Sequence, residues 1–116
     1  MARIEYSQIA RLKLFALKDE LTLKYGIENA MRTISKIMSG IRRLENFTDS
    51  GVEISGRFDL ETDYRYIFLC HNYIFYRVIN VNTVIILDML NEKEDFMKTL
   101  FGVNTISQEN SDYWDE

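Results

Sequence analysis

The periodicity of the apolar residues changes near residue 63, and this change restricts the chain to folds that combine helices with strands. Between residues 8 and 46, apolar residues recur at the three- and four-residue spacing of amphipathic helices. After residue 63 the runs YRYIFLC, NYIFYRVI and TVIILDML are rich in aromatic and β-branched residues, which is typical of strands. The sequence therefore predicts an α+β fold, in which a helical hairpin covers one face of a small antiparallel sheet of three or four strands.

Two helices are predicted in the first half of the chain. Ser7 can cap a helix over residues 8–25, because its hydroxyl can accept a hydrogen bond from a backbone N–H, and a glycine follows this helix. The second helix is expected over residues 28–46. Arg42 and Arg43 lie in its last turns, where cations interact favourably with the helix dipole.

The remaining elements are short. Residues 2–6 are expected to form an N-terminal strand, and residues 47–63 are expected to connect the helices to the strands. The separators His71-Asn72 and Asn80-Val81-Asn82 are short enough for antiparallel hairpins, since asparagine tolerates a positive φ. Residues 91–102 are expected to form a short C-terminal helix with Asn91 as its cap.

Length and composition limit the classes of protein. The 116 residues suit one domain, which we place at residues 1–103, followed by an acidic tail at 104–116 that is expected to be flexible. The net charge of −4 argues against a dedicated nucleic-acid binder, and no sequence-specific nucleic-acid binding is expected. The single cysteine, the absence of a signal peptide and the absence of a long apolar run predict a cytoplasmic protein without a membrane partner.

Cys70 and His71 stand side by side, and they are the only residues of their types. A catalytic dyad needs both side chains in contact and a third group that orients the base. Neighbouring strand residues point to opposite faces, so we interpret the pair as the tip of a hairpin, in which the Cys70 thiol is expected to be buried. A lone histidine and the absence of a glycine-rich phosphate loop predict no metal site and no cofactor.

The alternation along the strand runs places Arg65, Tyr73, Phe75 and Arg77 on one side of the sheet. Two aromatic rings between two arginines suit a surface that binds a protein partner. The alternative interpretation is an ordinary solvated sheet face with extended arginine side chains.

The order of elements resembles the RelE/ParE superfamily of toxins from type II toxin–antitoxin systems, over roughly residues 2–103. The resemblance rests on ARIEYS before the first helix, YGIENA between the helices, the hairpin YRYIFLCHNYIFYRV and the closing run VIILDMLNEKEDFMKTLFG. The acidic-aromatic pair Asp95-Phe96 in this last run looks like the ParE-like branch. The resemblance implies a growth-inhibiting toxin that a cognate antitoxin holds inactive.

RelE-like members of the superfamily cut mRNA on the ribosome and require a set of cations and a proton-transferring group. Carried over by position, the basic residues of this set match Arg65 and Lys93. The other expected positions fall on Ile67, Tyr73 and near Thr99, so the candidate catalytic set is only Arg65, Tyr73 and Lys93. Lys93 also lies among acidic neighbours that would repel a phosphate backbone.

ParE-like members inhibit DNA gyrase and require a binding surface instead of a catalytic set. The resemblance therefore favours a gyrase-directed toxin, whose partner-binding residues are expected to be Arg65, Tyr73, Phe75, Arg77 and Lys93. The alternatives are a ribosome-dependent mRNA endonuclease and a non-toxic α+β interaction module.

Overall fold

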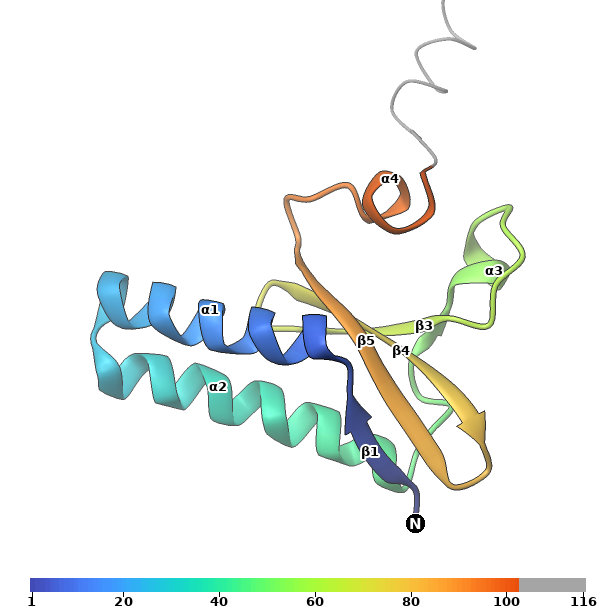
Figure 1. The fold of residues 1–116 in the computed structure, drawn as a ribbon, viewed down its shortest axis with the longest axis horizontal. Helices are drawn as coiled ribbons and strands as arrows, with labels where there is room; N and C mark the ends of the chain where they lie inside the picture. The colour runs from blue at the N-terminus through green and yellow to red at the C-terminus, as the bar shows by residue number, and fades with distance from the viewer. Residues whose placement is uncertain (103–116) are drawn as a thin grey trace, which may run out of the picture.

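The computed structural model describes residues 1–102, and these form a helical hairpin against a five-stranded sheet (Figure 1). Helices α1 (Gln8–Tyr25) and α2 (Ile27–Arg42) are joined at Gly26, whose φ of 87° suits a glycine. The Ser7 hydroxyl accepts a hydrogen bond of 3.0 Å from the N–H of Ala10, as the predicted cap requires. The predicted α+β fold and helical hairpin are confirmed. None of the described helices has the length and apolar character that crossing a membrane requires.

The sheet has the strand order β1-β5-β4-β3-β2. Strands β3 (Arg65–Leu69), β4 (Asn72–Asn80) and β5 (Thr83–Asn91) form the predicted antiparallel meander. Strand β1 (Arg3–Tyr6) pairs in parallel with the free edge of β5, which the long connection between the two strands allows. The sheet is therefore mixed, with five strands instead of the three or four that the sequence predicts.

A hydrophobic core lies on each face of the sheet. Between the helical hairpin and the sheet, the fully buried residues of the first core include Ile37, Ile41 and Leu44 from the helical segment and Ile74, Tyr76, Val84 and Ile86 from the strands. The second core lies on the opposite face. There α3 (Ile54–Arg57) and α4 (Phe96–Phe101) cover Phe75 and Leu90, and Figure 1 shows both short helices apart from the hairpin.

Two helix boundaries differ from the prediction. Helix α2 ends at Arg42 and continues as a 3-10 turn, η1 (Arg43–Glu45). The C-terminal helix begins at Phe96, where the Asp95 side chain accepts from the N–H of Lys98 at 3.3 Å. Asn91 does not cap this helix, because it belongs to β5 and its side chain accepts from the N–H of Lys93 in a turn.

The connecting segment 47–63 also contains structure that its composition does not predict. Strand β2 (Val52–Glu53) pairs with the start of β3, and α3 follows it directly. These elements are too short for periodicity to indicate them. The tail expected to be flexible at residues 104–116 lies outside the described residues.

Candidate functional site

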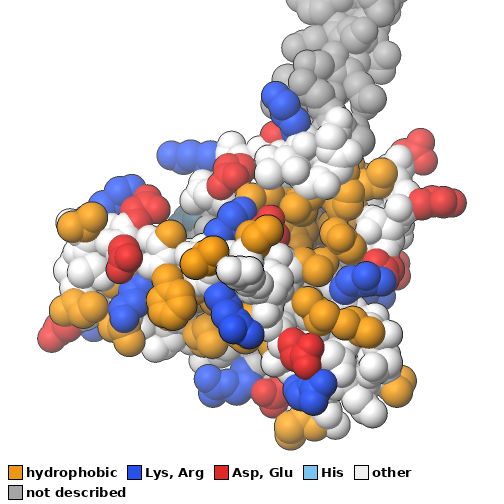
Figure 2. Space-filling model, viewed as in Figure 1, with side chains coloured by type: hydrophobic (Ala, Val, Ile, Leu, Met, Phe, Trp, Pro, Cys, Tyr) orange, Lys and Arg blue, Asp and Glu red, His pale blue; other side chains and the backbone are white. Residues whose placement is uncertain are grey.

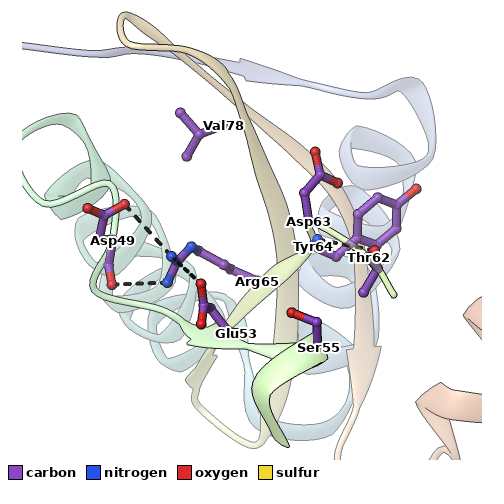
Figure 3. A pocket seen from close by; sticks show the side chains of 8 residues that line it. All are labelled: Asp49, Glu53, Ser55, Thr62, Asp63, Tyr64, Arg65 and Val78. Carbon is purple, nitrogen blue, oxygen red and sulfur yellow. Dashed lines mark hydrogen bonds and ion pairs between the residues drawn. The ribbon is translucent and has the colours of Figure 1, made fainter. Parts of the chain in front are cut away.

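Arg65 is fixed by its own chain. One terminal nitrogen lies 3.0 Å from a Glu53 carboxylate oxygen, and the other donates to the carbonyl oxygens of Gly51 at 3.1 Å and Asp49 at 3.3 Å. The side chain lines a hollow of about 220 Å³ that also contains Asp63 (Figure 3). Because its charge is neutralised and its donors are engaged, Arg65 is poorly placed to bind an external anion.

Arg77 also pairs with a carboxylate of its own chain, on the surface of the protein. Its guanidinium donates to one Asp63 oxygen from two nitrogens, at 2.8 and 3.2 Å. Both side chains are about half exposed, so this ion pair can open at little cost when a partner binds.

Phe75 lies in the core instead of on the surface. Its side chain is fully buried, and its ring centroid lies 5.2 Å from that of Phe96 in α4. Tyr73 is partly buried in the same cluster, 5.0 Å from Phe96. The prediction that Tyr73 and Phe75 form an exposed partner-binding surface is therefore wrong, because α4 covers this face of the sheet.

The expected grouping of Arg65 with Tyr73, Phe75 and Arg77 is also wrong. Alternation holds within one strand, but the register across the hairpin pairs Arg65 with Tyr76. Directly opposed residues of an antiparallel pair share a face, so Arg65 lies on the face opposite to Phe75. The turn has two residues, Cys70 and His71, and a two-residue turn brings odd-numbered and even-numbered residues together.

Lys93 lies in the turn after β5. It lines a hollow of about 320 Å³ together with Tyr73 and the acids Glu92, Glu94 and Asp95. Arg65 lies on the other face and at the opposite end of β3, so the three nuclease candidates do not meet at one point. Cys70 and His71 form the hairpin tip, and the His71 ring nitrogen Nδ1 lies 3.0 Å from Glu92 instead of contacting the thiol.

Comparison with solved structures places this geometry in a known fold. No family model and no curated protein matches the chain. A chain of the chromosomal ParDE TA (toxin–antitoxin) system from P. aeruginosa superposes with a TM-score of 0.64 at 19% sequence identity. The match covers 78% of this protein and 96% of that chain. The two chains share one fold. At this identity, the similarity extends to the ParE-like arrangement of helices and strands and not to individual site residues.

Within this ParE-like fold, a cationic groove follows the seam between α2 and β3. We define it by three successive hollows of about 790, 470 and 380 Å³, in which neighbouring hollows share lining residues. Five Lys and Arg side chains line the groove, against two carboxylates: Lys24, Arg32, Lys36, Arg43 and Lys93, against Glu20 and Glu92. Among residues 1–102, the side chains that line the middle hollow include no carboxylate.

The sequence contains a signal for the groove in the spacing of its basic residues. Arg32 and Lys36 are four residues apart, and Arg43 follows seven residues later, so the three lie on one side of the helical segment. In the described part of the chain, none of the three forms an ion pair with a carboxylate. Arg43 therefore contributes to a surface as well as to the end of a helix.

The far end of the groove combines aromatic rings with an open sheet edge. The side chains of Phe47 and Phe68 are 63% and 47% exposed and line this end. Strand β2 pairs with β3 only at Arg65 and Tyr66. Among residues 1–102, the outer edge of β3 beyond Tyr66 thus has no strand partner, which leaves backbone groups open to an added segment.

A second unusual surface is the outer side of α1. Ile9, Leu12 and Phe15 follow one another at three-residue spacing and are 55%, 60% and 66% exposed. In Figure 2 hydrophobic side chains lie over the helical hairpin, on the left of the view, among charged ones. Contiguous large apolar side chains on a surface are typical of a region that binds another protein.

Proposed function

We propose that this protein is a growth-inhibiting toxin of a type II toxin–antitoxin system, neutralised by a cognate antitoxin and directed at DNA gyrase. The observation that carries the proposal is the shared fold with a chain of a ParDE system, which extends over 96% of that chain. The proposal places the protein in the cytoplasm, where gyrase acts.

The site geometry favours binding over RNA cleavage. A ribosome-dependent nuclease needs several cations and a proton-transferring group around one phosphate. Here Arg65 is held by Glu53 and by backbone carbonyls, while Tyr73 and Lys93 lie elsewhere among acidic side chains. A gyrase-directed toxin does not need these groups to converge.

For the antitoxin we propose the outer side of α1 as the main contact surface. Its residues Ile9, Leu12 and Phe15 are large, apolar and exposed, so their burial against a partner would be favourable. Of the partner-binding residues expected from the sequence, Arg77, Lys93 and the exposed part of Tyr73 remain available as further contacts. Arg65 is engaged by Glu53 and Phe75 is fully buried, so we do not propose them as contacts.

The proposal is tested by expressing the chain in bacteria, with a reporter of the SOS response, and by a gyrase supercoiling assay on the purified protein. We expect growth arrest, SOS induction and inhibition of supercoiling. Coexpression of the protein encoded by the adjacent reading frame should restore growth. The variant Ile74→Asp, which places a charge in the first core, serves as the inactive control. Growth arrest without an effect on gyrase would disprove the target, and a folded but harmless protein would disprove the toxin assignment.

A further inference from the structure

The cationic groove has no role in the proposed function. The chain as a whole carries a net charge of −4, yet the groove gathers five cations against two carboxylates. Arg32, Lys36 and Arg43 extend over about 16 Å of the helical segment, at the rise of an α-helix. Phe47 and Phe68 stand exposed at one end. A ligand for this groove would be acidic, extended and partly aromatic.

The C-terminal segment of the same chain has this chemistry. Residues 109–116, ENSDYWDE, carry four carboxylates and two aromatic rings and contain no Lys or Arg. We propose that this segment binds in the cationic groove of its own chain, with its acids against Lys36 and Arg43 and its rings against Phe47 and Phe68.

The segment is long enough to reach the groove. The last described helix ends beside the start of β3, because the ring of Phe101 lies 5.6 Å from that of Tyr64. Leu69, which lines two of the three hollows, follows Tyr64 by five residues and hence lies within about 17 Å of it. Residues 103–116 can span about 46 Å when extended, so most of the segment remains to lie along the groove.

The contacts would be individually weak and jointly sensitive to salt. Exposed ion pairs contribute little one at a time, and added salt screens them. The segment is tethered to the groove, however, so its effective concentration is in the range of about 1 mM or more. It would thus shield the cations from other anionic molecules. An acidic protein segment or a nucleic acid would have to displace it before binding there.

Trp114 reports on this contact directly, because it is the only tryptophan of the chain. In the full-length protein at low salt, we expect a blue-shifted Trp114 emission and quenching by acrylamide that is at least about twofold weaker than for free tryptophan amide. Raising the salt to about 1 M, where the Debye length is about 3 Å, should shift the emission to the red and increase the quenching. Since the contact is within one chain, a hundredfold dilution should change neither value.

Charge reversal locates the contact. The variant Lys36→Glu/Arg43→Glu should show the high-salt emission and quenching already at low salt. The matched control Arg11→Glu/Lys18→Glu changes two cations with the same seven-residue spacing on α1, outside the groove, and should behave like the wild type. Far-UV circular dichroism verifies that each variant is folded. Three results would each overturn the proposal. They are full exposure of Trp114 in the wild type, an unchanged signal in the Lys36/Arg43 variant, and a signal that depends on protein concentration. The last result would assign the contact to a second copy of the chain.

Discussion

The hydroxyl group of Tyr76 accepts a hydrogen bond of 2.9 Å from the backbone N–H of Gly51, and it donates one of 2.8 Å to the carbonyl oxygen of Thr48. The side chain of Tyr76 is fully buried in the first core, so it ties the loop after η1 to the centre of the sheet. This loop also supplies the Asp49 and Gly51 carbonyls that hold Arg65. One buried hydroxyl thereby fixes the segment that positions the arginine.

We predict that Tyr76→Phe lowers the free energy of unfolding by about 1–3 kcal/mol, because the Gly51 N–H loses its partner inside the protein. Gly51→Ala should be at least as costly, since an added Cβ would lie 2.6 Å from the Tyr76 ring and 2.9 Å from the Tyr66 carbonyl oxygen. Gly56→Ala is the matched control, because its Cβ would meet only ordinary contacts, the nearest at 3.5 Å. Urea unfolding curves measure all three. Equal stability of the Gly51 and Gly56 variants would contradict this account.

Stability should fall at alkaline pH. Burial raises the pKa of Tyr76 above its ordinary value of 10.0, although the hydrogen bond from Gly51 lowers it somewhat, and burial also raises the pKa of Tyr6. The folded protein therefore keeps these protons at a pH at which the unfolded chain has lost them. The free energy of unfolding should be unaffected by these groups below about pH 10 and should decrease as the pH rises above it. Tyr76→Phe should reduce this slope in urea titrations between about pH 9 and 11.

Cys70 and His71 should be dispensable for function. Both adopt positive φ angles, 50° and 66°, which asparagine and glycine accept more readily in a two-residue hairpin turn. Cys70→Ser/His71→Gln should leave growth inhibition intact. Cys70→Asn/His71→Gly should raise the free energy of unfolding by about 1 kcal/mol, as the left-handed conformation becomes less strained. Loss of growth inhibition in either folded variant would assign the tip a direct role.

The antitoxin surface can be located by titration of the cognate antitoxin against two double variants. Leu12→Ala/Phe15→Ala should weaken binding by about 2 kcal/mol or more, because both substitutions remove exposed apolar area that a partner would bury. Arg77→Ala/Lys93→Ala should have a smaller effect, since these cations are exposed and lie beside acids of their own chain. The reverse order of effects would place the antitoxin on the sheet side instead of on α1.

Ribosome-dependent mRNA cleavage by the purified protein should be weak or absent, because Arg65, Tyr73 and Lys93 do not converge. Arg65→Ala should instead reduce stability, since it removes the ion pair with Glu53 and leaves two carbonyl oxygens without their donor. Primer extension on ribosome-bound mRNA tests the cleavage, and urea unfolding tests the stability. Efficient cleavage that Arg65→Ala abolishes would restore the nuclease hypothesis.

Local patterns in the sequence were sufficient for the two long helices and the meander. The Ser7 cap, the helix over residues 8–25 and the three strand runs were predicted close to their observed bounds, because periodicity and capping depend on neighbours in the chain. The same reasoning placed Cys70 and His71 at a hairpin tip, which the structure confirms. Each of these conclusions required only residues a few positions apart.

The tertiary structure decided which residues share a surface. The parallel pairing of β1 with β5, the burial of Phe75 under α4 and the engagement of Arg65 by Glu53 all join segments that are distant in the sequence. The cationic groove likewise exists only because β3 lies beside α2. The physical reason is that alternation fixes the two faces of each strand, while the register of the hairpin and the packing of separate helices determine what each face meets.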